Sequence, residues 1–164
     1  MFVSKHWFMF VGLFLIMMST ACSLQKDHEM PGIDIPEEDM NTDLHLIIPT
    51  ENVPITQGHP IPLVLENSSD ETIIFSEING IHIFQSIDDE WLNIENRMDY
   101  PSKDIIVYPK NNGFSLPVWT VVNPVIYPAE SVLIRIVLIG NVFNGETNEL
   151  GESLGTFIDI NLEP

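Results

Sequence analysis

Apolar and polar residues alternate in the last third of the chain with the period of two that is typical of β-strands. Residues 131–139 give the strongest strand prediction because they are rich in β-branched side chains and long enough to cross a sheet. The final segment alternates in the same way, with Asp159 and Asn161 between apolar neighbours. The positions predicted to face the core are Val132, Ile134, Ile136, Leu138, Ile158, Ile160 and Leu162, and Arg135 is predicted to lie on the outer face.

Shorter runs of the same kind are separated by turn residues over the rest of the chain from residue 44 onward. No stretch has the 3.6-residue period of a long amphipathic helix. The pattern predicts an all-β fold, an antiparallel sandwich of about seven to nine strands. The other predicted strands are residues 44–48, 61–66, 72–75, 81–84, 91–94, 105–108 and 119–122, and the predicted turns are residues 67–70, 79–80, 111–113 and 144–145.

Four large side chains outside the longest strands are predicted to anchor the core. Leu63 and Leu65 fall on one phase of their strand. Trp91 and Trp119 are interpreted as core residues in preference to a ligand platform.

The first 21 residues have the composition of a secretory signal peptide. A start that carries Lys5 is followed by an apolar run over residues 7–18 and by small residues up to Ala21. A membrane-spanning helix needs roughly 20 apolar residues, so this run of 12 is too short to be one. We therefore expect these residues to direct export.

Cys22, the only cysteine of the chain, follows this leader directly. The sequence Ser19-Thr20-Ala21-Cys22 resembles the lipobox of bacterial lipoproteins, although Ser19 stands where the family usually has Leu. The resemblance implies cleavage between Ala21 and Cys22, a lipid on Cys22, and attachment to a membrane of the bacterial cell envelope on its exported side. The alternative is an ordinary signal peptidase site and a soluble secreted protein with a free thiol.

Residues 22–43 predict a disordered acidic tether between this anchor and the sandwich domain. They carry seven acidic residues against Lys26, and Pro31 and Pro36 interrupt them. The acidic residues 37–39 could bind calcium, although a solvated spacer is the simpler interpretation. The predicted organisation is a signal peptide at residues 1–21, the lipidated cysteine and tether at 22–43, and the domain at 44–164.

The charge and cysteine count of the chain exclude several classes of function. Six Lys and Arg against 24 Asp and Glu give a formal net charge of −18, which repels nucleic acid. One cysteine excludes an intramolecular disulfide and a cysteine-rich zinc site. A basic or calcium-bridged partner is therefore favoured over an acidic one.

Several turn-and-strand motifs resemble those of small bacterial Ig-like modules. Residues 63–73 read as a strand, an Asn-x-Ser, an acidic turn and a second strand, and residues 88–91 continue the pattern. Residues 127–131 resemble a Pro-Gly-Glu-Ser motif, with Ala129 in place of Gly. These motifs are distantly similar to the bacterial intracellular proteinase inhibitor domain, and the resemblance implies an Ig-like sandwich and, as one alternative, inhibitor activity.

No catalytic motif is supported by its surroundings in the sequence. Residues 151–155 match G-x-S-x-G, but the segment after them reads as a strand and contains no His, so the match is a coincidence. His28, His45, His59 and His82 have no metal-ligand spacing. A small hydrolase with paired carboxylates remains an alternative, because the distance between carboxylates decides that chemistry.

Residues 140–155 are predicted to form a long loop between the two best strands, a usual place for a binding site on a sandwich. Glu146, Glu149 and Glu152 could supply oxygen ligands to calcium there, although an acidic hairpin loop is the plainer interpretation. No other cofactor is expected. The sequence thus predicts a membrane-anchored envelope lipoprotein that is not an enzyme and that binds another envelope protein or an extracellular ligand.

Overall fold

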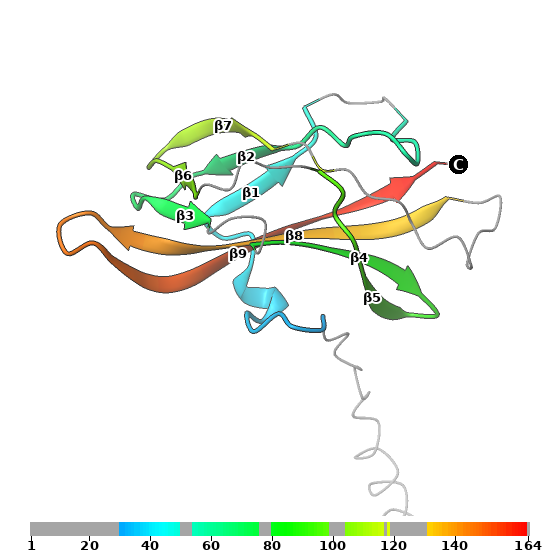
Figure 1. Ribbon diagram of the computed structural model, residues 1–164, viewed down its shortest axis with the longest axis horizontal. Helices are drawn as coiled ribbons and strands as arrows, with labels where there is room; N and C mark the ends of the chain where they lie inside the picture. The colour runs from blue at the N-terminus through cyan, green and yellow to red at the C-terminus, as the bar shows by residue number, and fades with distance from the viewer. Residues whose placement is uncertain are drawn as a thin grey trace, which may run out of the picture.

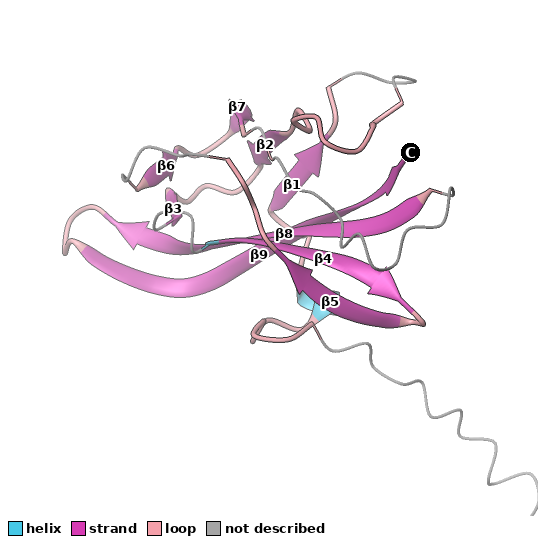
Figure 2. Ribbon diagram, turned by 45° about the vertical axis from the view of Figure 1, so that its right-hand side comes forward, coloured by secondary structure: helices cyan, strands magenta, loops and turns pink. Residues whose placement is uncertain are grey.

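The alternating segments form two antiparallel β-sheets that pack face to face (Figures 1 and 2). The computed structural model describes residues 30–49, 54–75, 80–98, 104–116, 118 and 131–163. The smaller sheet contains β1 (Leu44–Ile47), β2 (Val64–Asn67) and β7 (Asn111–Ser115). The larger sheet contains β3 (Ile73–Phe75), β4 (Ile81–Ile87), β5 (Glu90–Ile94), β6 (Ile105–Val107), β8 (Val132–Asn144) and β9 (Glu149–Leu162).

The long hairpin of β8 and β9 is the centre of the larger sheet. One edge of β8 pairs with β9 along almost its whole length. The other edge is shared, because β4 pairs with the first half of β8 and β3 pairs with its end. The first half of β8 therefore lies in the order β9-β8-β4-β5, and β3 and β6 extend the sheet beside its end.

A glycine on β8 allows β3 to pack closely against it. A Cβ atom on Gly140 would lie 2.6 Å from the ring of Phe75 and 2.7 Å from Cγ2 of Ile73. Any larger residue at this position would therefore displace the side chains of β3.

The main core lies between the two sheets and confirms most of the predicted inward positions. Ile134 and Ile136 are fully buried at the centre of β8, and Leu65 is fully buried on the facing sheet. Ile158 is partly buried against the same core. The other predicted core residues that are buried there are Leu63, Val132, Leu138, Ile160 and Leu162.

Trp91 does not belong to this core, contrary to the prediction. It pairs with Ser86 on the edge of the larger sheet and is partly buried against a second apolar cluster on the opposite face of that sheet. Its phase in β5 decides this, because the alternating residue Ile94 is the one that packs against the main core. Trp119 and the predicted strand at residues 119–122 lie outside the described residues.

Two other local predictions were wrong. Residues 111–113 were predicted to form a turn, but they form the start of β7. The turn lies just before them, at residues 109–110. The predicted loop at residues 140–155 is mostly strand, because β8 and β9 continue to Asn144 and Glu149 with a turn at residues 145–148. Asn144 closes that turn, since its Oδ1 accepts hydrogen bonds from the backbone N–H groups of Glu146 and Thr147.

A short 3-10 helix, η1 (Glu37–Asp39), precedes β1. Among the described residues no helix has both the length and the apolar character needed to cross a membrane.

The packing of β8 predicts opposite responses at adjacent positions. We expect Ile134→Ala to lower the free energy of unfolding by about 2–5 kcal/mol, because it removes a fully buried side chain and leaves a cavity. Leu133→Ala, at a position 36% exposed, is the matched control and should cost about 1 kcal/mol or less. Urea denaturation measures both, and equal losses would contradict the assignment of the two faces.

Candidate functional site

A segment before β1 covers the outer face of the larger sheet. Residues 30–41, called the arm below, lie on the side of this sheet that faces away from β1, β2 and β7 (Figures 1 and 2). Met30 and Met40 are 7% and 4% exposed, and they form an apolar cluster with Phe84 and Val137 of the sheet. Ile33 and Ile35, Trp91, Ile139 and Phe157 pack around this cluster.

Arg135 lies under the arm, at the centre of the covered face. Its side chain forms a bidentate pair with Asp159 of β9, with Nε 2.7 Å from Oδ1 and Nη2 2.8 Å from Oδ2. Its third nitrogen, Nη1, donates to Oε2 of Glu37 in η1 at 2.6 Å. One buried guanidinium therefore joins two strands of the sheet to the arm.

Two aromatic rings complete the surroundings of this guanidinium. Cζ of Arg135 lies 4.6 Å from the ring centroid of Trp91 and 4.1 Å from that of Phe157. Both distances are within the range of cation–π attraction. We call Arg135, Asp159, Glu37, Trp91 and Phe157 the Arg135 clasp.

The Arg135 clasp keeps its central residue charged. Burial by itself lowers the pKa of the Arg135 guanidinium, but the hydrogen bonds from Asp159 and Glu37, and the attraction of their charges, outweigh burial and raise the pKa. The guanidinium therefore stays charged, with two carboxylates as its partners.

Asn41 attaches the end of the arm to the edge of β9. Its N–H donates to the carbonyl of Gly155 at 3.1 Å. Its Oδ1 accepts from the N–H of Phe157 at 2.8 Å and from the hydroxyl of Thr156 at 2.6 Å. Asn41 adopts a left-handed φ of 59°, a conformation that Asn tolerates better than most residues. The backbone N–H and the side-chain Oδ1 of Asn41 thus bond to backbone groups on this edge of β9, as a neighbouring strand would.

These contacts differ from two expectations of the sequence. Arg135 does lie on the outer face of β8, but it is only 6% exposed because the arm covers it. Residues 30–43 were predicted as part of a disordered tether, whereas the structure packs residues 30–41 onto the sheet. The signal that could have revealed the arm is the spacing of Ile33 and Ile35, which places two apolar side chains on one side of an acidic segment.

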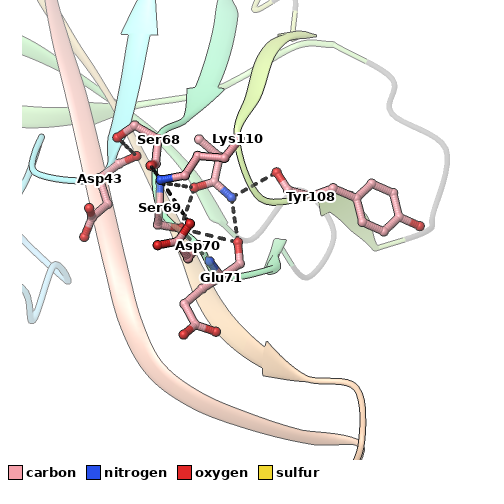
Figure 3. A network of polar contacts seen from close by, with 8 residues as sticks. Asp43, Ser68, Ser69, Asp70, Glu71, Tyr108 and Lys110 are labelled. Atoms are coloured by element: carbon pink, nitrogen blue, oxygen red, sulfur yellow. Dashed lines mark hydrogen bonds and ion pairs between the residues drawn. The ribbon is translucent and has the colours of Figure 1, made fainter.

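A second polar cluster ties the two sheets together around the buried Asn67 at the end of β2. Its Nδ2 donates to the carbonyl of Glu71 at 2.8 Å and to that of Tyr108 at 3.2 Å. Its Oδ1 accepts from the N–H and the hydroxyl of Ser69. Figure 3 shows this turn beside Lys110, whose Nζ donates to the carbonyl of Ser68 at 2.5 Å. The cluster holds the chain where it passes from the smaller to the larger sheet.

The residues of this cluster have a structural role and little chemistry of their own. Ser68 also reaches back to the carbonyl of Asp43, at the start of β1, through its hydroxyl and its N–H. The ion pair of Lys110 with Asp70 is exposed, so it contributes little to stability. Figure 3 shows the ring of Tyr108 directed away from the cluster, and this residue is 63% exposed.

The predicted calcium residues do not gather at one point. Glu146 lies in the hairpin turn, whereas Glu149 and Glu152 lie on β9, and all three are exposed. Within the described ranges, no group of three or more His, Cys, Asp or Glu residues is placed to hold a metal ion. The acidic residues 37–39 belong to η1, where Glu37 is engaged by Arg135.

Other residues singled out from the sequence are strand residues or lie outside the description. Residues 151–155 lie entirely within β9, where Ser153 accepts a hydrogen bond from Nδ2 of Asn141. Ala21, Cys22, His28 and residues 127–130 lie outside the described residues.

A scan of protein-family models, a search of curated proteins and a search of solved structures each found no match to this chain.

The Arg135 clasp predicts a large cost for removing the guanidinium. We expect Arg135→Ala to lower the free energy of unfolding by about 2–4 kcal/mol. Two carboxylates lose their partner and two aromatic rings lose a packed group, but Asp159 and Glu37 are 38% and 48% exposed, so water recovers part of the loss. Chemical denaturation measures this change.

Arg135→Lys is the matched control for charge. A lysine keeps the cation but cannot form the bidentate pair with Asp159, so it should recover only part of the loss. A loss below about 0.5 kcal/mol for Arg135→Ala, the value typical of an exposed residue, would contradict the clasp.

The Asn67 cluster predicts a pH-dependent defect. Asn67→Asp removes the Nδ2 donor and places a carboxyl group opposite the carbonyls of Glu71 and Tyr108. Burial and these oxygens raise the pKa of the introduced carboxyl above its unfolded value. The variant should therefore lose least stability near pH 4 and progressively more as the pH rises to 7. Asn93→Asp, at an exposed position, is the control, and an equal pH dependence in both variants would contradict the prediction.

Proposed function

We propose that the chain is a lipid-anchored protein of the bacterial cell envelope, and that its β-sandwich is a non-catalytic binding or accessory module. The observation that carries this proposal is the position of the single cysteine. Cys22 follows an apolar run and the small residues Ser19, Thr20 and Ala21, as in a lipobox. Two or more acyl chains on that cysteine would hold the protein durably at a membrane.

The contacts of the domain support a binding role more than a catalytic one. Ser153, the serine of the G-x-S-x-G match, is part of a regular strand pair and not of a sharp strand-to-helix turn. The charged groups of the Arg135 clasp are satisfied by one another, which is typical of a structural contact.

The charge of the chain supports a basic or cation-bridged partner. A net charge of −18 attracts basic surfaces over long distances and repels acidic ones. The hairpin of β8 and β9 contributes three exposed glutamates near its end: Glu146, Glu149 and Glu152. Another envelope protein or an extracellular ligand with a basic surface fits this charge.

The anchor predicts a defined change of mass and location. In bacterial cells that express the full chain, we expect mature protein in the membrane fraction, with Cys22 at its N-terminus and an intact mass that includes diacylglycerol. Cys22→Ala should leave unprocessed precursor, whereas Ser23→Ala is a control beside it and should be processed normally. Mature protein recovered entirely in the soluble fraction with a free thiol would refute the anchor.

The binding role is tested separately with the membrane-anchored protein. Envelope proteins are captured on it at low and high salt, because an interaction that depends on its acidic surface must weaken as salt increases. Turnover of a glycan or peptide substrate that a single Asp or Glu substitution abolishes would replace the binding role with an enzymatic one.

A further inference from the structure

We propose that the arm is a releasable strap that sets how far the domain reaches from its membrane anchor, with the Arg135 clasp as its fastening. This inference rests on the proposed lipid anchor at Cys22. It concerns the residues between that anchor and the first strand of the domain.

The maximum distance between Cys22 and the domain depends on whether the arm is docked on the sheet or released. Met30, the first buried residue of the arm, follows Cys22 by eight positions, and a fully extended chain of that length spans at most about 28 Å. If the arm leaves the sheet, the chain is free up to Leu44, 22 positions after Cys22, and can span at most about 77 Å. Docking of the arm therefore reduces the maximum distance between membrane and domain by more than half.

Three kinds of contact fasten the arm, and each is made by different residues. Met30 and Met40 bury apolar surface against Phe84 and Val137. Glu37 pairs with Arg135, and Asn41 bonds to the edge of β9 at Gly155 and Phe157. The three contacts lie along one segment, so loss of one weakens the hold of its neighbours.

Several features of the arm suit it to release. It forms no strand pairing with the sheet, and its short helix η1 has no buried residue. Glu37 is 48% exposed, so water can solvate its carboxylate when it separates from Arg135. Segments with few buried apolar residues and exposed hydrogen bonds open at a lower free energy than the core does.

The matched pair Glu37→Ala and Glu38→Ala tests the strap. The two variants remove the same charge from adjacent residues of η1, but only Glu37 contacts Arg135 through an ion pair in the structure. Hydrogen exchange of the full lipidated chain in vesicles is read at the amides of Asn41 and Phe157, neither of which touches Glu37 through a hydrogen bond. We expect exchange at both amides to accelerate at least tenfold in Glu37→Ala and to stay unchanged in Glu38→Ala.

Reach is measured in the same vesicles by energy transfer from a dye at Glu146→Cys, in the hairpin turn, to acceptor-labelled lipid. The double variant Glu37→Ala/Asn41→Gly should transfer less efficiently than the parent, because the domain can move farther from the bilayer. Glycine keeps the left-handed backbone conformation of Asn41 and removes its side-chain amide. The arm therefore loses contacts without added strain.

Each outcome decides between the two proposals. Unchanged exchange in Glu37→Ala, or faster exchange with unchanged energy transfer in the double variant, would overturn the strap. Failure of the parent chain to carry lipid or to bind vesicles would instead overturn the anchor, and intact mass reports this before any exchange is measured. A far-ultraviolet spectrum that matches the parent shows that each variant is folded.

Discussion

The buried guanidinium of Arg135 imposes the constraint on which the covered face of this domain depends. A cation under an apolar layer is tolerated only if its donors are paired, and here all three of its donating nitrogens reach a carboxylate. Asp159 supplies two of these contacts from the neighbouring strand, but the third must come from outside the sheet. That requirement connects a central strand to Glu37, which is 98 positions away in the chain. Arg135 thus fixes the position of the arm, because its guanidinium would be left without one of its carboxylate partners if the arm were absent.

β8 satisfies two packing demands through the alternation of its side chains. Ile134 and Ile136 point toward the smaller sheet and build the main core, whereas Arg135 and Val137 point toward the arm. Because β8 is covered on both faces, it has no solvent-exposed polar face of the kind that alternation in the sequence predicts. This explains the continuous burial from Ile134 to Leu138, where alternation in solvent exposure was expected.

The sequence was sufficient to predict the sandwich and most of the described strands, since these depend on local alternation and on turn residues. It failed where a neighbour far along the chain decides the outcome. Residues 111–113 look like a turn, but pairing with β2 draws Asn111 into β7. The arm was interpreted as a spacer because its prolines and acids are typical of solvated chain. Its contacts with distant residues of the sheet, among them the pairing of Glu37 with Arg135, change that interpretation. Similarly, Gly145 correctly indicated a turn, but the inter-strand pairing that extends β8 and β9 toward it could not be read from either strand alone.

The same contacts couple the attachment of the arm to the stability of the sheet. Asp159 pairs with Arg135 across β8 and β9 as well as completing the clasp, and Asn41 covers the edge of β9 at Thr156 and Phe157. Release of the arm therefore uncovers apolar side chains and part of a strand edge, both of which favour association with another chain. A domain whose edge and face are covered by its own arm is protected from such association as long as the clasp is closed. The residues that attach the arm are thus also those that cover this face of the sheet.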